Sequence, residues 1–259
     1  MKILSFSTVT LIISLFIAAS IPDSQFKSAG RAEGSPGFAV VELFTSEGCS
    51  SCPSADALIA RIQKENNDKP VYILAFHVDY WNRLGWKDVF SDPAFTKRQR
   101  QYASWLKLSS VYTPQAVING STEFVGSQET SMRKAITEGL GKKAAVTIGL
   151  EHVKASGNQV AFDYQINGTI ANSSLTVALV QRKAESRIRS GENAGRTLSH
   201  VQITRAIQTL ILSGNSRGKT QIAIPRDVKA SELELLVLLQ NNQDGSIIAA
   251  SKAALESHT

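Results

Sequence analysis

The 259-residue sequence is poor in cysteine and contains only Cys49 and Cys52. A zinc site rich in thiolates needs three or four cysteines, so such a site lacks ligands here. A disulfide stabilises a fold mainly when it closes a long loop, whereas this pair encloses two residues. The scarcity and spacing of cysteine therefore argue against both a thiolate-rich metal site and a purely structural disulfide.

Long blocks of like charge are also absent. The formal net charge is +6, and the densest basic cluster, residues 97–100, is explained by a solvated helix face. We therefore expect no nucleic-acid partner. The sequence has no His-x-x-x-His motif and no clustered carboxylates, so we predict neither a metal nor a cofactor. His152, His200 and His258 are isolated along the chain, and no role is predicted for them.

The first 20 residues have the pattern of an export signal. Lys2 gives a positive start, residues 3–19 are almost wholly apolar or hydroxylic, and residues 18–20 are small enough for cleavage. An uncleaved membrane anchor is the alternative, because the apolar stretch is near the lower length limit for a span. We expect an exported protein, periplasmic or secreted, with no other membrane contact. Export would place the cysteines where a disulfide can persist.

Residues 21–37 are rich in Ser, Gly, Ala and Pro and predict a flexible lead-in. Beyond them, apolar runs and helical periodicities alternate in the order β-α-β-α-β-β-α, which predicts an α/β domain with a mixed sheet over residues 38–141. The segments are 39–44 (strand), 53–64 (helix), 71–76 (strand), 92–108 (helix), 115–118 (strand), 122–125 (strand) and 127–140 (helix).

The pattern changes after residue 141, where short strands are separated by turn signals such as Asn167-Gly168 and Asp244-Gly245. This spacing predicts an all-β, sandwich-like domain of about seven strands over residues 142–259. The alternative is that these strands extend a single sheet. The clearest strand segments are 146–153, 159–166, 175–181, 220–224 and 233–239.

The Cys-x-x-Cys pair follows the first predicted strand and opens the first helix. Two thiols at this spacing and place can interconvert between dithiol and disulfide, so we interpret the pair as redox-active, against a metal-binding or an inert role. Cys49 would be the attacking thiol, because the positive end of the helix dipole lowers the pKa of a thiol there. Cys52, one turn into the helix, would be the more buried resolving thiol.

Several neighbours of the pair are candidate supporting residues. Glu47 would oppose thiolate formation if its side chain pointed inward, but a surface carboxylate is the favoured interpretation. Ser50 and Ser51 could donate hydrogen bonds to a thiolate or satisfy local backbone groups. His77 and Asp79 follow a central strand, where α/β sheets place ligand sites. They could share a face as a proton shuttle or metal ligands, although capping of the loop by hydrogen bonds is the commoner role.

The order of elements, together with Thr113-Pro114 just before the third strand, resembles the thioredoxin fold. In that fold a proline at this place has a cis peptide bond and faces the cysteine pair. The resemblance implies that Pro114, if cis, shapes the surface on which the backbone of a partner docks. The chain departs from ordinary thioredoxins because no tryptophan precedes Cys49 and because Ser50-Ser51 replaces Gly-Pro.

More narrowly, the chain resembles the exported thioredoxin-like family catalogued as domain of unknown function 1223. The glycine-rich part of the resemblance, residues 191–198, lacks the Lys and Ser/Thr of a phosphate loop. We interpret it as a long loop of the second domain that could contact the first. The stretches that carry the resemblance are 41–53, 77–81, 84–88, 112–115, 117–120 and 191–198.

Three functions are compatible with these features. The leading prediction is an exported thiol–disulfide oxidoreductase that acts on protein or small-molecule thiols and disulfides, and it requires an exposed, acidic Cys49. The first alternative is a non-catalytic binding module in which the disulfide only locks a loop. The second is a soft-metal chaperone that uses both thiolates with His77.

Overall fold

The computed structural model describes residues 35–212 and 214–255. The predicted export signal, most of the lead-in and His258 lie outside these residues. In the two described ranges, no helix combines the length and the apolar character needed to cross a membrane.

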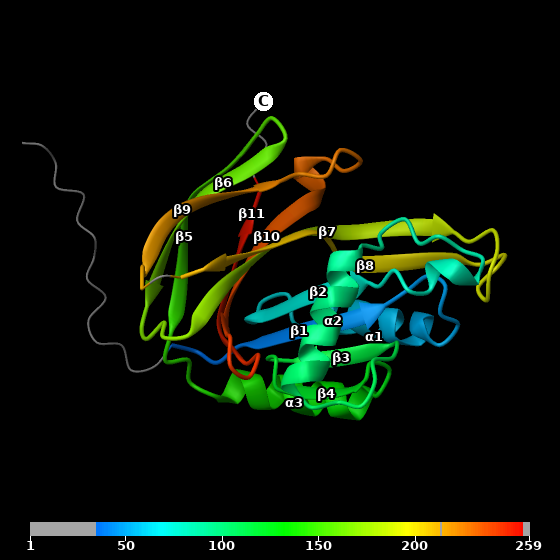
Figure 1. The fold of residues 1–259 in the computed structure, drawn as a ribbon, viewed down its shortest axis with the longest axis horizontal. Coiled ribbons are helices and arrows are strands. Elements are labelled where there is room, and N and C mark those ends of the chain that lie inside the picture. The colour runs from blue at the N-terminus through cyan, green and yellow to red at the C-terminus, as the bar shows by residue number, and fades with distance from the viewer. Residues whose placement is uncertain (1–34, 213, 256–259) are drawn as a thin grey trace, which may run out of the picture. The chain divides into compact units, whose positions relative to one another are not determined.

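The first half of the described chain has the predicted order of elements, shown from blue to green in Figure 1. The helix expected over 92–108 ends earlier, at Trp105, and Lys107 takes a left-handed conformation with φ 54°. The elements are β1 (Ala39–Thr45), α1 (Cys52–Glu65), β2 (Val71–His77), the 3-10 turn η1 (Asn82–Leu84), α2 (Pro93–Trp105), β3 (Gln115–Ile118), β4 (Thr122–Val125) and α3 (Glu129–Gly141).

The second half is built of strands, and it includes two that were not among the predicted segments, β8 and β11. Strand β8 is hard to recognise because several of its buried positions carry polar residues, such as Gln202 and Thr204, so its buried face is not apolar in the sequence. The elements are β5 (Thr147–Ser156), β6 (Gln159–Asn167), β7 (Ser173–Arg187), β8 (Thr197–Ile211), β9 (Arg217–Ala223), the 3-10 turn η2 (Ala230–Glu232), β10 (Leu233–Asn241) and β11 (Ile247–Ala254).

Strands from both halves share one mixed sheet in the order β11-β10-β7-β8-β2-β1-β3-β4. The halves join where β2 runs parallel to β8, with Ala75 opposite Ile203. The sheet therefore crosses the boundary predicted at residue 141, and the alternative of a single extended sheet holds for β7, β8, β10 and β11. The described residues accordingly belong to one compact unit.

A second, antiparallel sheet of β5, β6 and β9 lies against the C-terminal part of the large sheet (Figure 1). Apolar side chains from both sheets form a common core, for example Val160 and Phe162 of β6 with Val177 of β7 and Val237 of β10. The predicted sandwich packing is thus present, but one of its two layers is continuous with the α/β part.

Helices cover both faces of the N-terminal half of the large sheet. Helices α1 and α3 pack on one face of β1, and α2 packs on the other face. All seven residues of β1 are consequently buried, as expected of a strand covered on both sides. Its one charged residue, Glu42, is paired with Arg98 of α2 at 2.5 Å. This covered strand leads directly into the cysteine motif.

Candidate functional site

The cysteine motif lies between the end of β1 and the start of α1. Cys49 and Cys52 form a disulfide, and Cys52 is the first residue of α1. Both cysteines are 0% exposed, whereas Ser50 and Ser51 between them are exposed. The expectation that Cys49 would be more accessible than Cys52 is therefore wrong for the disulfide state. The Ser51 hydroxyl lies 3.4 Å from Cys49 Sγ, close enough for a weak hydrogen bond.

The Thr113–Pro114 peptide bond is cis and lies near the cysteine motif. Two residues, Trp81 and Gly126, each contact both segments and establish this proximity. Trp81 Nε1 donates to Thr113 Oγ1 at 2.8 Å, and the Cβ of the same tryptophan would be 3.2 Å from a Cβ added at Gly48. Gly126, whose N–H donates to Pro114 O at 2.8 Å, also lies against Ala55 of α1. The tertiary structure therefore brings Thr113 and Pro114 to the start of α1.

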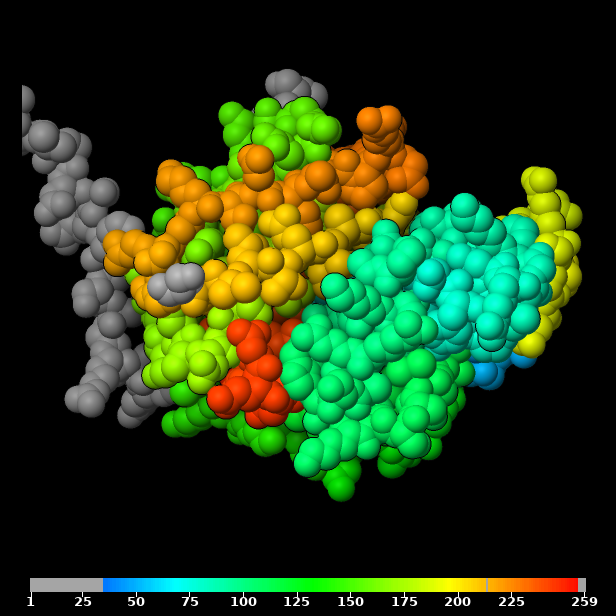
Figure 2. All heavy atoms as spheres, in the orientation of Figure 1, coloured from blue at the N-terminus to red at the C-terminus, as the bar shows by residue number. Residues whose placement is uncertain are grey.

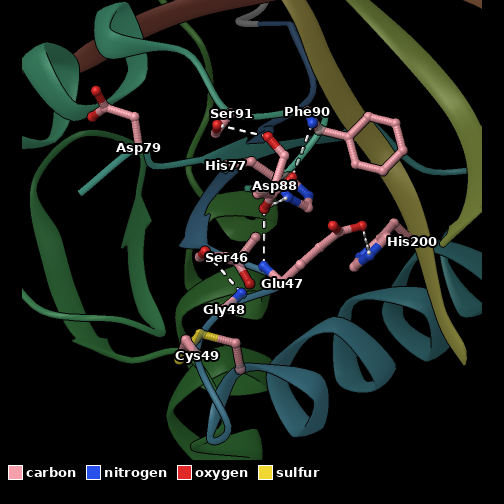
Figure 3. A network of polar contacts seen from close by, with 12 residues as sticks. Ser46, Glu47, Gly48, Cys49, His77, Asp79, Asp88, Phe90, Ser91 and His200 are labelled. Carbon is pink, nitrogen blue, oxygen red and sulfur yellow. Dashed lines mark hydrogen bonds and ion pairs between the residues drawn. A yellow bond between two sulfur atoms is a disulfide. The ribbon is translucent and has the colours of Figure 1, made fainter. Parts of the chain in front are cut away.

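His77 and Asp79 do not act as a pair. The His77 ring is buried, with Nδ1 2.7 Å from Asp88 Oδ2, whereas Asp79 accepts a hydrogen bond from Thr96 Oγ1 at 2.5 Å. Figure 3 shows the two side chains pointing apart. The predicted common face is wrong because β2 ends at His77 and the chain bends at Asp79. Asp79 instead caps the loop by hydrogen bonding, the commoner role for an aspartate at this place.

Asp88, which the sequence did not single out, connects the loop after β2 to the cysteine motif. Its carboxylate accepts hydrogen bonds of 2.9 Å from the backbone N–H groups of both Glu47 and Phe90. Burial raises the pKa of Asp88, but His77 and the two N–H donors outweigh burial and hold the pKa below its usual value. Asp88 is therefore a stable carboxylate that fixes Glu47 two residues before Cys49.

Glu47 is buried, so its interpretation as a surface carboxylate is wrong. Trp86 Nε1 donates to Glu47 Oε2 at 2.7 Å, and Glu47 Oε1 lies 3.4 Å from Nε2 of His200 in β8. The other ring nitrogen of His200, Nδ1, lies 3.6 Å from Asp56 Oδ2 of α1. A histidine from the C-terminal half of the chain is thus held between two carboxylates from either side of the cysteine pair. Figure 3 shows its contact with Glu47.

His200 is a titratable member of this site that was missed in the sequence. Burial lowers its pKa, but Asp56 and Glu47 outweigh burial and raise the pKa to about 9. The imidazolium is therefore the dominant form at neutral pH. The His200 and His77 rings also meet edge to face, with centroids 4.8 Å apart. The sequence next to His200 contains no catalytic motif. The only signal near it is the stretch 191–198, which resembles the DUF1223 family.

The loop between β7 and β8 covers the cysteine motif. This agrees with the predicted contact between residues 191–198 and the first half of the chain. The Asn193 side-chain amide donates to Glu47 O at 2.9 Å and to Cys49 O at 3.0 Å. Glu192 Oε2 accepts from the backbone N–H of Ser50 at 2.9 Å. Nearby, Ser190 Oγ donates to Gly85 O at 2.5 Å, and Figure 2 shows this yellow hairpin tip against the cyan segment. We call residues 190–196 the capping loop.

The described residues contain no group of three or more His, Cys, Asp or Glu side chains arranged to hold a metal ion. The buried cluster around His200 is instead a set of ion pairs: Glu47 and Asp56 pair with His200, and Asp88 pairs with His77.

Comparison with known proteins identifies the family. The family described as "Protein of unknown function (DUF1223)" matches residues 40–240, which include the cysteine motif, the cis-proline and the capping loop. The chain belongs to this family. The family description assigns no activity. Comparison with curated proteins gave no match.

Two solved structures resemble the chain over most of its length. A crystal structure of a protein from Agrobacterium tumefaciens has a TM-score of 0.64 and 29% identity, and the match covers 88% of this chain and 100% of that one. HBP35 of Porphyromonas gingivalis has a TM-score of 0.59 and 14% identity, with coverage of 85% and 76%. The second likeness concerns the fold alone.

Proposed function

We propose that this DUF1223 protein is an exported thiol–disulfide oxidoreductase and that residues 38–141 are the thioredoxin-like part of its fold. The observation that carries the proposal is the Cys49–Cys52 disulfide at the N-terminus of α1, beside the cis Thr113–Pro114 bond. A short-range disulfide contributes little to stability through loop closure. A helix N-terminus, in contrast, favours the thiolate that exchange requires.

The proposed reaction begins with a substrate thiolate that attacks Cys49 Sγ. The new bond joins the substrate sulfur to Cys49, and the Cys49–Cys52 bond breaks with its electron pair on Cys52. A second substrate thiolate then attacks the mixed disulfide, which releases an oxidised substrate and the reduced dithiol. In the reverse direction the dithiol reduces a substrate disulfide, with Cys52 as the resolving thiol.

Neighbouring residues would assist this exchange or restrict access to the sulfur. The Ser51 hydroxyl, 3.4 Å from Cys49 Sγ, can donate a hydrogen bond to a Cys49 thiolate. Asn193 binds Cys49 O and would have to move before a large substrate could reach the sulfur. Pro114 would present its backbone to the partner. The proposed substrates are therefore small thiols or extended protein segments that displace the capping loop.

Export of the mature chain is part of the proposal. It is supported by the signal pattern of residues 1–20 and by the disulfide, which persists in oxidising compartments such as the periplasm. No partner beyond thiols and disulfides is proposed, and nucleic acid is not among the proposed ligands.

The reduction potential of the Cys49–Cys52 pair tests the proposal. The mature chain is equilibrated in glutathione buffers, quenched with acid, alkylated and analysed by mass. A value between about −120 and −270 mV, the span of known exchangers, supports the activity. A value below about −300 mV, typical of structural disulfides, contradicts it. A Cys52→Ser variant should also trap mixed disulfides, and a Cys49→Ser variant serves as the control because it lacks the attacking sulfur.

One observation favours the second candidate, a non-catalytic binding module. Both cysteines are 0% exposed in the disulfide state, under a loop tied to the motif by hydrogen bonds. In that case the double Cys49→Ser, Cys52→Ser variant keeps full binding to whatever partner the wild-type protein captures. The binding-module function is contradicted if the double variant loses capture and Cys52→Ser traps mixed disulfides.

A further inference from the structure

His200 occupies an unusual position for a residue with no motif of its own. Its two ring nitrogens face Glu47 at 3.4 Å and Asp56 at 3.6 Å. These carboxylates lie in the chain on either side of the cysteine pair: Glu47 precedes Cys49, and Asp56 follows Cys52. The ring therefore bridges the two ends of the motif from a strand that lies far away in sequence.

Asp56 also has a direct geometric relation to Cys52. Both belong to α1 at positions i and i+4, and both are buried. Side chains at this spacing lie on the same helix face, with Cβ atoms about 5–6 Å apart. A helical side chain also leans toward the N-terminus, so Asp56 leans toward Cys52. Thr45 Oγ1 donates to Asp56 Oδ1 at 3.0 Å, while Asp56 Oδ2 faces His200.

The cluster has spare hydrogen-bonding capacity. Glu47 Oε1, both ring nitrogens of His200 and Nε2 of His77 are buried without a hydrogen-bond partner. Buried polar atoms in proteins are nearly always paired, and the exceptions frequently have a chemical role. Both His200 nitrogens are thus held at ion-pair distances, 3.4 Å from Glu47 and 3.6 Å from Asp56, without a closed hydrogen bond.

Resting on the thiol–disulfide activity proposed above, we propose that His200 is a proton-relay residue for Cys52 that acts through the carboxylate of Asp56. When a substrate thiolate attacks Cys49, the broken bond leaves its electron pair on Cys52, buried in a site that disfavours an unpaired charge. The His200 imidazolium gives its proton to the Asp56 carboxylate, and Asp56 passes that proton on to the Cys52 thiolate.

The step balances without a further reagent. The attacking thiol gives its proton to solvent, Cys52 gains the proton from His200, and neutral His200 regains one from solvent. In the reverse direction His200 first loses its proton to solvent. The Cys52 thiol then gives its proton through Asp56 to the neutral imidazole as its sulfur attacks the mixed disulfide. The disulfide is the oxidant, and the substrate thiol is the reductant.

The charge on His200 is set by groups from every element around it. Glu47 from the turn after β1 and Asp56 from α1 face its nitrogens. On its other sides, His200 contacts two rings. The His77 ring of β2 is paired with Asp88, and the Phe90 ring centroid lies 5.7 Å from that of His200. The guanidinium of Arg205, also in β8, lies over the Phe90 ring at 5.3 Å.

The rate of disulfide reduction by dithiothreitol between pH 6 and pH 10 tests the relay. Each rate constant is corrected for the thiolate fraction of the reagent, so that the remaining pH dependence belongs to the protein. In the wild type the corrected rate should be high below pH 9 and fall above it, as His200 loses its proton. In His200→Asn it should be about tenfold lower at pH 7 and nearly independent of pH.

His152→Asn is the matched control, because His152 also pairs with a carboxylate, Asp163, but on the exposed face of the smaller sheet. It should retain the wild-type profile. If His200→Asn does not fold, Asp56→Asn interrupts the same relay and should show the same loss. A wild-type pH profile in either variant overturns the relay alone. A wild-type disulfide that does not exchange at all overturns the proposed function together with the relay.

Discussion

The side-chain amide of Asn193 bonds to the backbone carbonyl of Cys49 at 3.0 Å, across 144 residues of sequence. The same amide binds Glu47 O, so one side chain spans the turn that carries the first sulfur. Asn193 is itself buried. Access to the disulfide is therefore coupled to the capping loop, which comes from the β7–β8 hairpin and not from the α/β part of the chain.

Replacement of Asn193 by Ala should make the disulfide easier to reach. The change removes two hydrogen bonds to carbonyls of the motif, and loss of partners for buried acceptors costs about 1–3 kcal/mol each. We expect faster reduction by dithiothreitol, by about threefold to tenfold, and a lower free energy of unfolding in urea. Asn167→Ala, at an exposed end of β6, is the control. An unchanged reduction rate in Asn193→Ala contradicts the capping role.

The contact between Glu192 of the capping loop and the backbone N–H of Ser50 should depend on pH. Hydrogen bonds from Ser50 hold the pKa of this exposed carboxyl below its usual value. A lowered pKa means that the contact is present near neutral pH and is lost as the pH falls through the folded-state value. Glu192→Gln should therefore speed reduction by a tris(alkyl)phosphine about twofold at pH 7. At the lowest pH at which the fold persists, the variant and the wild type should react alike.

His200 should make stability depend on pH in the alkaline range. Its pKa is raised to about 9 in the folded chain, against about 6.5 in an unfolded chain. The stabilisation is complete below pH 6.5 and is lost as the pH rises through 9. Urea unfolding should show the difference between wild type and His200→Asn shrinking by about 1–3 kcal/mol over this window. His152→Asn should show no comparable change.

The buried pair of Glu42 and Arg98 should be a strong determinant of folding. Arg98 donates to Glu42 at 2.5 Å and to Gln240 of β10 at 3.2 Å, so it joins β1 to the C-terminal strands through α2. Arg98→Met leaves an uncompensated buried carboxylate and should cost about 3–5 kcal/mol. The double variant with Glu42→Leu should recover most of this loss in urea unfolding. Equal instability of the single and double variants would argue against the charge as the cause.

Much of the α/β half could be predicted from the sequence because its signals are local. The apolar run of β1 and the helical period of α1 predicted the elements around the cysteines, and the positions of Cys49, Cys52 and Pro114 followed from them. The resemblance to the DUF1223 family, confirmed by the match over residues 40–240, rested on the same short stretches. Local patterns of this kind do not depend on what packs against them.

The interactions around the motif could not be predicted, because they depend on which strand lies beside β2. Strand β8 lies inside the sheet, but its buried polar residues make it hard to predict as a central strand. The pairing of Ala75 with Ile203 brings β8 to the site. This pairing places His200 between Glu47 and Asp56, and the hairpin before it places Asn193 over Cys49. Burial of Glu47, which contacts His200, follows from the same packing.

The sequence by itself therefore determined the chemistry that is available: two thiols at a helix start, a proline before the third strand and the pattern of an export signal. Spacing along the chain is enough to specify these features. Only the tertiary structure decided the environment of the thiols, namely their burial, their capping loop and the charged cluster beside them. Such an environment arises from contacts between residues more than 100 positions apart, and those contacts exist only once the sheet has formed across the two halves of the chain.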